Sequence, residues 1–205
     1  MKMIERVRFV ALDIALLLDP ELDALCRRLN SAKGAEPFSD LKKPTNYPHV
    51  TLAMGVFREG EIPAILKELV LLRPQLPVRL SVTDLYCKVS EQIGQEYQLM
   101  IERDTAFNAF YTNFRERINP YITSSPASQD MFVVERDEVW NPNTTHWVDG
   151  FRHKKPDDYK PHISLKCRNA SLDVPLPIEG RGTKIVIAQI GNYCSCRTIL
   201  REVHK

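Results

Sequence analysis

Two histidines far apart in the sequence lie in nearly identical segments: residues 42–52 read K-K-P-T-N-Y-P-H-V-T-L, and residues 154–165 read K-K-P-D-D-Y-K-P-H-I-S-L. Ordinary residue usage gives such a recurrence around a second histidine a chance on the order of 10⁻⁴. Side chains at i and i+2 of a strand share a face, so each copy would present an imidazole and a hydroxyl together. The four side chains are His49, Thr51, His162 and Ser164. The repeat therefore predicts two half-sites that face one pocket.

Two imidazoles on opposite sides of a substrate can divide the work of acid and base, because their unperturbed pKa lies near neutrality. A neutral imidazole would accept a proton from the attacking water or hydroxyl, and a protonated one would donate to the departing oxygen. The hydroxyls of Thr51 and Ser164 could donate hydrogen bonds to non-bridging oxygens as charge grows. Lys166, four residues after His162, would add positive charge there. This chemistry suits transfer at a phosphodiester and needs no metal.

Other catalytic chemistries fit the sequence less well. A zinc site usually needs at least three converging ligands, and neither repeat carries an acid two or four residues after its histidine. The sequence contains no P-loop and no Gly-x-Ser-x-Gly motif. Its five cysteines form no Cys-x-x-Cys pair, which indicates free thiols in a reducing compartment. We therefore expect no metal, no cofactor and a cytoplasmic location.

The composition is that of an ordinary globular protein. The chain has 205 residues, of which 43% are hydrophobic and 26% charged. A net charge of +2 is too small to indicate a polyanion-binding surface over the whole protein, so any basic function must be local. The apolar run from Val7 to Leu18 is short and contains Asp13, which indicates a buried strand and no membrane span.

The hydrophobic pattern predicts an α+β fold with a partly antiparallel sheet. Helices are expected at Pro20–Asn30, Ile62–Leu72 and Thr105–Arg117. Strands are expected at Val7–Ile14, His49–Phe57, Val78–Lys88, Glu96–Glu102, Met131–Val139, His162–Cys167, Lys184–Ile190 and Tyr193–Leu200. A turn is expected at 91–95, and a long loop from Trp140 to Asp158. No boundary separates independent domains, so we expect residues 1–205 to form one domain with two pseudo-symmetric lobes.

The paired His-x-Thr and His-x-Ser motifs resemble the signature of the 2H phosphoesterase superfamily. This superfamily includes bacterial 2′-5′ RNA ligase-like proteins, plant and fungal cyclic nucleotide phosphodiesterases, and viral and animal 2′,5′-phosphodiesterases. The resemblance covers most of the chain, including the opening strand Phe9–Asp13, the His-x-Thr strand with the helix after it, and the C-terminal strand. The chain differs by extra residues around 131–156, and by Lys166 or Arg168 where many bacterial members carry arginine.

The resemblance implies a bilobal α+β fold with mainly antiparallel sheets, flanked by helices around a central groove. It also implies that His49 and His162 act as acid and base while Thr51 and Ser164 bind phosphate oxygens. The expected activity is that of a metal-independent phosphodiesterase on 2′,3′-cyclic or 2′,5′-linked nucleotides or oligonucleotides. A non-catalytic nucleotide-binding module and an RNA end-joining enzyme are the alternatives.

Further residues near the repeats are candidates for substrate binding. Tyr47 and Tyr159 could stack on a base or ribose, or pack against the lobe. Arg152 and Lys154 belong to a local basic cluster that could contact flanking phosphates. The expected partner is a nucleotide or short RNA, with no membrane, and the chain is expected to be a monomer. The sequence does not decide the natural substrate or which histidine is the acid.

Overall fold

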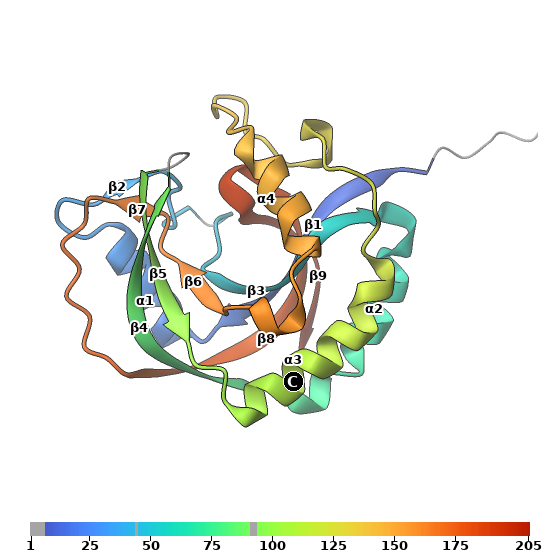
Figure 1. The fold of residues 1–205 in the computed structure, drawn as a ribbon, viewed down its shortest axis with the longest axis horizontal. Helices are drawn as coiled ribbons and strands as arrows, with labels where there is room; N and C mark the ends of the chain where they lie inside the picture. Colours follow the sequence, from blue (N-terminus) through green and yellow to red (C-terminus); the bar gives the residue numbers. More distant parts are fainter. Residues whose placement is uncertain (1–6, 44, 91–93) are drawn as a thin grey trace, which may run out of the picture.

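The computed structural model of the chain describes residues 7–43, 45–90 and 94–205. A curved seven-stranded sheet has the order β3-β1-β8-β4-β5-β6, and β9 also pairs with β8 (Figure 1). Its strands are β1 (Phe9–Leu18), β3 (His49–Arg58), β4 (Val78–Ser90), β5 (Gly94–Ile101), β6 (His162–Ser164), β8 (Ile178–Gly191) and β9 (Ser195–His204), all paired antiparallel. A small second sheet joins β2 (Glu36–Pro37) to β7 (Cys167–Arg168). The helices are α1 (Pro20–Asn30), α2 (Ile62–Val70), α3 (Thr105–Ile118) and α4 (Asn143–Arg152).

The long strand β8 joins two arms of the sheet. Its residues 178–182 pair with β4, and its residues 184–191 pair with β9. Along its other edge it pairs with β1. One arm therefore contains β3, β1 and β9, and the other contains β4, β5 and β6. This arrangement confirms the expected α+β class and mainly antiparallel sheet.

The two repeat strands are not neighbours in the sheet. They are its terminal strands, β3 at one end and β6 at the other. The sheet curves so that these ends approach each other (Figure 1). Directly before β6, the hydroxyl of Tyr159 donates a hydrogen bond of 2.7 Å to the backbone oxygen of Thr51 on β3. The curvature thus brings the two halves of the repeat together without any backbone pairing between them.

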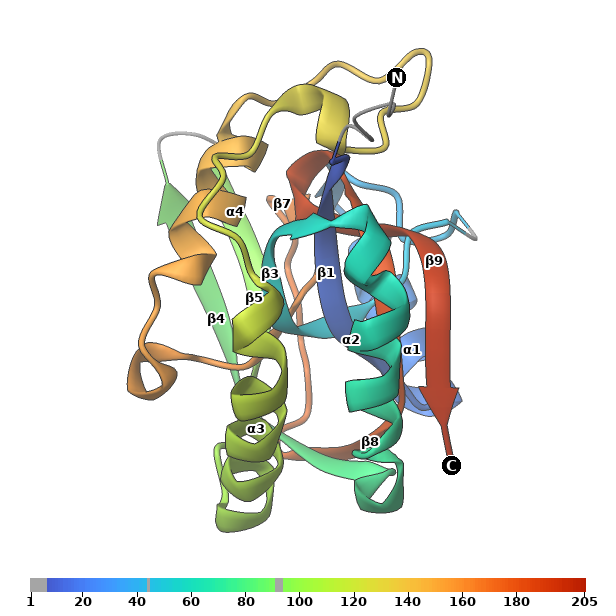
Figure 2. The ribbon, with the colours of Figure 1, turned by 90° about the vertical axis from the view of Figure 1, so that its right-hand side faces the viewer.

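Helices α1, α2 and α3 begin where the sequence predicts. Asp19 caps α1 by accepting a hydrogen bond from the backbone nitrogen of Leu22, and Pro20 occupies the first turn. Asp104 caps α3 in the same way through Phe107. The aromatic residues of α3 are buried, as their spacing predicts. Helices α2 and α3 lie side by side (Figure 2).

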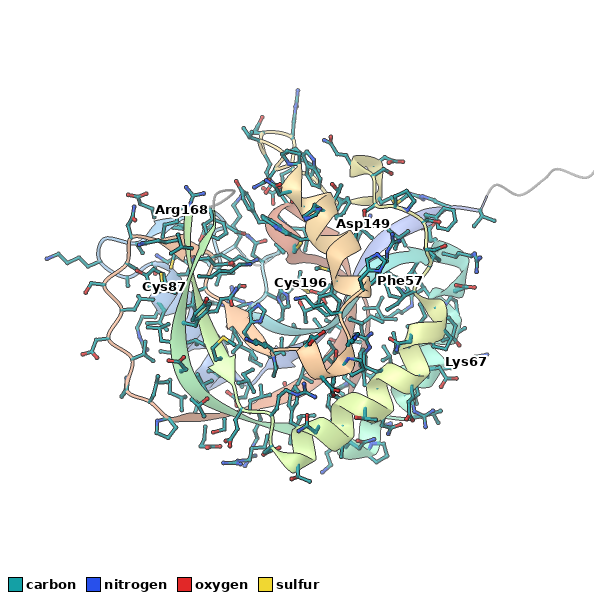
Figure 3. All side chains as sticks on the ribbon, viewed as in Figure 1. Phe57, Lys67, Cys87, Asp149, Arg168 and Cys196 are labelled. Carbon is teal, nitrogen blue, oxygen red and sulfur yellow. The ribbon has the colours of Figure 1, made fainter. Side chains whose placement is uncertain are left out.

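The buried side chains form one large cluster and a small one. In Figure 3, Phe57 and Cys196 belong to this interior, whereas Lys67 and Cys87 are at the surface. All five cysteines are free, as predicted, and three of them are buried. None of the helices in the described ranges is long and apolar enough to cross a bilayer.

Three expectations about the second half of the chain are wrong. The segment Met131–Val139 is not a strand and makes only an isolated bridge, from Val133 to Gly191. The expected strand His162–Cys167 is divided, because Lys166 has a φ of 53° that ends the extended conformation. The turn expected at 91–95 is not one of the three, because it lies mainly outside the described residues.

The third error concerns Trp140–Asp158, which contains the helix α4 instead of a continuous loop. Its buried residues are Thr144, Val148 and Phe151. Their spacing of four and three residues is helical. The signal was therefore present in the sequence, but Asn-Pro before it and Gly150 within it indicated a loop.

Candidate active site

A cavity of about 650 Å³ is lined by residues from β3, β4, β5, β6 and α4. His49 and Thr51 line it from β3, and His162 and Ser164 line it from β6. The four repeat side chains therefore share one cavity. Alternation along each strand turns the histidine and the hydroxyl of each copy to the same face.

The first half-site is tied to a buried carboxylate. Nδ1 of His49 is 2.7 Å from the backbone oxygen of Tyr47, and Nε2 is 3.0 Å from Oδ2 of Asp13. The hydroxyl of Thr51 donates to the same Oδ2 at 2.9 Å. A carbonyl oxygen can only accept, so Nδ1 carries a proton. Nε2 faces the carboxylate oxygen, so both ring nitrogens of His49 lie against hydrogen-bond acceptors and the ring is arranged to donate.

Asp13 was not recognised as a site residue from the sequence. Its side chain is fully buried in β1, beside β3, and its Oδ1 atom has no hydrogen-bond partner among the described residues. A buried carboxylate is costly unless it is paired or hydrogen-bonded. The sequence signal for such a position is a lone acid within an apolar strand.

In the second half-site, one ring nitrogen of the histidine is free to accept a hydrogen bond. Nδ1 of His162 is 2.8 Å from the backbone oxygen of Lys160, and Nε2 has no hydrogen bond in the described part of the chain. Burial lowers the pKa of His162, and the nearby Lys160 carbonyl and Glu96 only partly oppose this effect. The neutral imidazole is thus favoured, with Nδ1 as the donor and Nε2 as a free acceptor.

The inserted residue Lys160 explains a difference between the two copies. In each copy, Nδ1 of the histidine bonds to the carbonyl of the residue two positions earlier, which is Tyr47 in one and Lys160 in the other. The insertion moves Tyr159 one residue further from its histidine. The backbone contact is therefore repeated, but the tyrosines take different positions.

The predicted substrate-binding tyrosines do not line the cavity. Tyr159 is buried, stacks on Tyr111 with ring centroids 4.0 Å apart, and donates to the Thr51 backbone. Tyr47 forms an isolated bridge with Cys196 and packs beside the small buried cluster. Both positions agree with the packing alternative, which the sequence left open.

The predicted basic residues, unlike the tyrosines, fall into two groups. Lys154 and Lys166 line the cavity, whereas Arg152 does not and donates to the backbone oxygen of Ser125 at 3.0 Å. Burial and the charge of Lys88 lower the pKa of Lys154. Lys166 is buried, and its Nζ donates to the backbone oxygen of Tyr193 at 2.7 Å.

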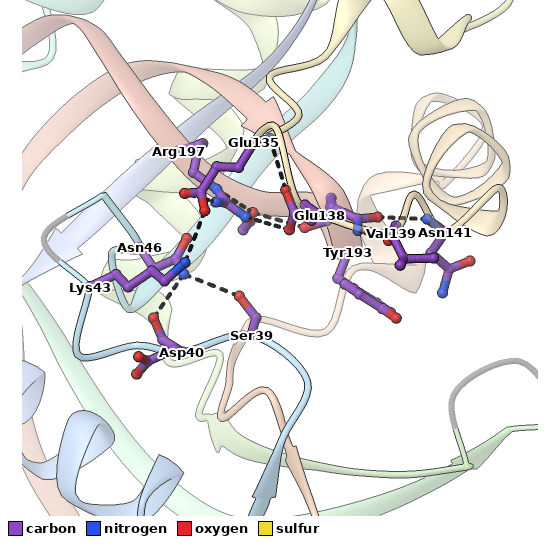
Figure 4. Close-up of polar contacts among 12 residues, drawn as sticks. Ser39, Asp40, Lys43, Asn46, Glu135, Glu138, Val139, Asn141, Tyr193 and Arg197 are labelled. Atoms are coloured by element: carbon purple, nitrogen blue, oxygen red, sulfur yellow. Dashed lines mark hydrogen bonds and ion pairs between the residues drawn. The ribbon is translucent and has the colours of Figure 1, made fainter.

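An ion-pair network holds the segments that precede the two cavity-lining elements β3 and α4. Arg197 binds Glu135 at 2.6 Å and Glu138 at 2.9 Å, and Lys43 binds Glu135 at 2.9 Å (Figure 4). Asn46 donates to Ser39 and to the backbone of Asp40. Lys43 is therefore engaged with Glu135 and is not a free cation of the cavity.

No protein-family model matches the sequence, and no curated protein matches it significantly. Solved structures with a similar fold do exist. TT0787 of Thermus thermophilus matches with a TM-score of 0.56 and 16% identity, covering 95% of this chain and 97% of that one. LigT of E. coli, in complex with NADP+, matches with a TM-score of 0.54 and 15% identity, covering 96% of this chain and 98% of that one.

The chain therefore has the fold of E. coli LigT over nearly its whole length. At 15–16% identity, this likeness concerns the fold alone. In residues 7–43, 45–90 and 94–205, no three or more His, Cys, Asp or Glu side chains gather as a group that could hold a metal ion.

Proposed function

We propose that this chain is a 2H phosphoesterase that cleaves a nucleotide phosphodiester, either a 2′,3′-cyclic phosphate or a 2′,5′ linkage, without a metal. The observation that carries the proposal is that both histidine–hydroxyl pairs line one cavity. The fold shared with E. coli LigT supports it. That the LigT structure contains NADP+ further supports a nucleotide as the ligand.

The hydrogen bonds of the two histidines support different roles. His162 is the base, because its Nε2 is free to accept and burial lowers its pKa. His49 is the acid, because both of its ring nitrogens lie against hydrogen-bond acceptors, the Tyr47 carbonyl and the Asp13 carboxylate. Thr51 and Ser164 bind the non-bridging oxygens and stabilise their growing charge. The two histidines therefore have different environments although their sequence motifs are alike.

For a cyclic phosphate, the oxygen of water bonds to phosphorus and gives its proton to His162. The bond from phosphorus to one ribose oxygen breaks, and that oxygen takes a proton from His49. For a 2′,5′ linkage, the neighbouring 3′-hydroxyl replaces water as nucleophile and the product is a 2′,3′-cyclic phosphate. In both cases the proton gained at His162 and the proton lost at His49 balance, and exchange with solvent restores the starting state.

One observation favours a second candidate function, a nucleotide-binding module without catalysis. Nε2 of His49 is already engaged by Asp13, at 3.0 Å. As the acid, His49 must transfer this hydrogen bond to the leaving oxygen when substrate binds. Catalytic hydrogen bonds often take their final geometry only in the complex, so turnover distinguishes the two functions.

The test is a screen of 2′,3′-cyclic nucleotides and 2′,5′-linked dinucleotides in the presence of a chelator, with the products resolved by chromatography. We expect turnover by the wild type and a loss of roughly 10²- to 10⁴-fold in His49→Ala and His162→Ala, because each removes a proton-transfer group. His204→Ala is the matched control, since His204 lies exposed at the end of β9. Wild-type turnover in both active-site variants would overturn the proposal, and binding without turnover in the wild type would establish the second candidate.

A further inference from the structure

One wall of the cavity is a patch of side chains on β4, β5 and β6 that extends beyond the motif residues. The strand register places Gln98 beside Ser164, and Tyr86 beside Gln98. It likewise places Lys88 beside Glu96. All of these side chains line the cavity. Neighbouring strands are about 4.8 Å apart, so this wall reaches from Ser164 across Gln98 to β4.

Glu96 is the unusual member of this wall. It is only 5% exposed, yet it lines the cavity. Its Oε2 accepts one long hydrogen bond, of 3.3 Å, from the side chain of Gln98. Its Oε1 has no hydrogen bond among the described residues, and the nearest cation is Nζ of Lys166 at 4.0 Å. A carboxylate can accept about four hydrogen bonds, so Glu96 offers a ligand most of its acceptor capacity.

Lys166 balances the charge of this carboxylate. Its own side chain is held by a hydrogen bond of 2.7 Å to the backbone oxygen of Tyr193. Its ammonium group is therefore fixed between Glu96 and Tyr193, where it offsets part of the cost of a buried negative charge. Lys166 also lines the cavity, so the positive charge that the sequence predicted it to add beside Ser164 stays a prediction.

We propose that Glu96 recognises the base of the bound nucleotide and selects guanine. The inference rests on the proposed function, which places the nucleotide phosphate between the two histidines. Guanine alone among the common bases presents two adjacent N–H donors, at N1 and N2, which match the two oxygens of one carboxylate. Adenine, cytosine and uracil each place an acceptor next to their donor, and this acceptor would face a carboxylate oxygen. The half-exposed ring of Tyr86, on the same wall, offers a surface on which the base can stack.

The test is equilibrium binding of the 2′-monophosphates of guanosine, adenosine, cytidine and uridine to the full chain, measured by titration calorimetry. A pair of hydrogen bonds to a base edge discriminates by roughly ten- to a hundredfold. We expect the wild type to bind the guanine nucleotide more tightly by that factor. Glu96→Gln should lose the preference, because an amide offers one acceptor and one donor. Glu116→Gln, an exposed acid on α3, removes the same charge and should retain the preference.

Equal affinities of the wild type for all four nucleotides would overturn the inference, and this comparison holds even if Glu96→Gln does not fold. An equal loss for all four bases in Glu96→Gln would also overturn it, because Glu96 would then act on the ribose or on the fold. Turnover is measured separately on the four 2′,3′-cyclic nucleotides. Guanine-selective binding without turnover contradicts the proposed function alone, whereas equal turnover and equal binding of all four bases contradict the base selection alone.

Discussion

Oδ2 of the buried Asp13 lies 3.0 Å from Nε2 of His49. The same oxygen accepts the hydroxyl hydrogen of Thr51. One carboxylate on β1 therefore contacts both repeat side chains of the first half-site. The second half-site lacks such a partner at Nε2 of His162 in the described part of the chain, so two similar motifs have different hydrogen-bond surroundings.

Asp13→Asn should lower kcat by roughly 10- to 100-fold. This is the range found in metal enzymes when the residue that orients a metal-binding histidine is removed. The amide keeps the size of the side chain, and its oxygen can still accept from His49 and Thr51. It removes the negative charge beside His49 and leaves a buried NH₂ group at the position of Oδ1, which has no hydrogen-bond partner among the described residues. KM should change less, because Asp13 is fully buried and acts through its neighbours. Steady-state kinetics would measure both parameters.

The control for this variant is Asp137→Asn, which neutralises an exposed acid in the segment before α4. Its kinetics should match those of the wild type. A folded Asp13→Asn protein with unchanged kcat and an unchanged pH profile would contradict the orienting role.

The pH dependence of kcat/KM should reveal His162. Burial lowers the pKa of His162 below its ordinary value of 6.5. A base must be neutral to accept a proton, so activity is complete above this lowered pKa and falls as the pH decreases through it. The acidic limb of the profile should therefore have its midpoint below pH 6.5. A midpoint above that value, measured on a folded protein, would assign the limb to a different group.

Arg197→Met should destabilise the fold by about 2–3 kcal/mol, because it leaves Glu135 and Glu138 without their buried partner. The arginine side chain is 4% exposed, so water cannot replace it easily. Chemical denaturation would measure the change in the free energy of unfolding. Lys43→Met removes only an exposed contact to Glu135 and should destabilise less. Equal losses in the two variants would show that Arg197 does not anchor the network.

Tyr159→Phe should cost about 1–2 kcal/mol of stability, because the Thr51 backbone oxygen loses a hydrogen bond in the buried space between β3 and β6. The phenylalanine ring retains the stacking on Tyr111. Thermal unfolding would measure the effect, and activity should fall with it because this contact joins the two half-sites. A loss of nucleotide affinity with no change in stability would instead restore the substrate contact that the sequence predicted.

The sequence determined the features that depend on short-range patterns. The repeat identified His49, Thr51, His162 and Ser164, because strand geometry alone turns each histidine and hydroxyl to one face. Asp19 and Asp104 marked the starts of two helices, since capping depends on residues within one turn. The buried aromatic face of α3 also followed from helical spacing.

Only the tertiary structure decided which distant residues complete the site. The strands β3 and β6 lie at opposite ends of one sheet. The motifs alone do not predict this, because strand order and curvature result from the packing of the whole chain. Asp13 reaches His49 only through the pairing of β1 with β3, and Glu96 reaches the cavity only through the register of β5 with β6. Tyr159 packs on Tyr111 and reaches the Thr51 backbone, two contacts with segments distant in the sequence. Such contacts between distant segments depend on the register and on burial, and residue spacing alone does not encode them.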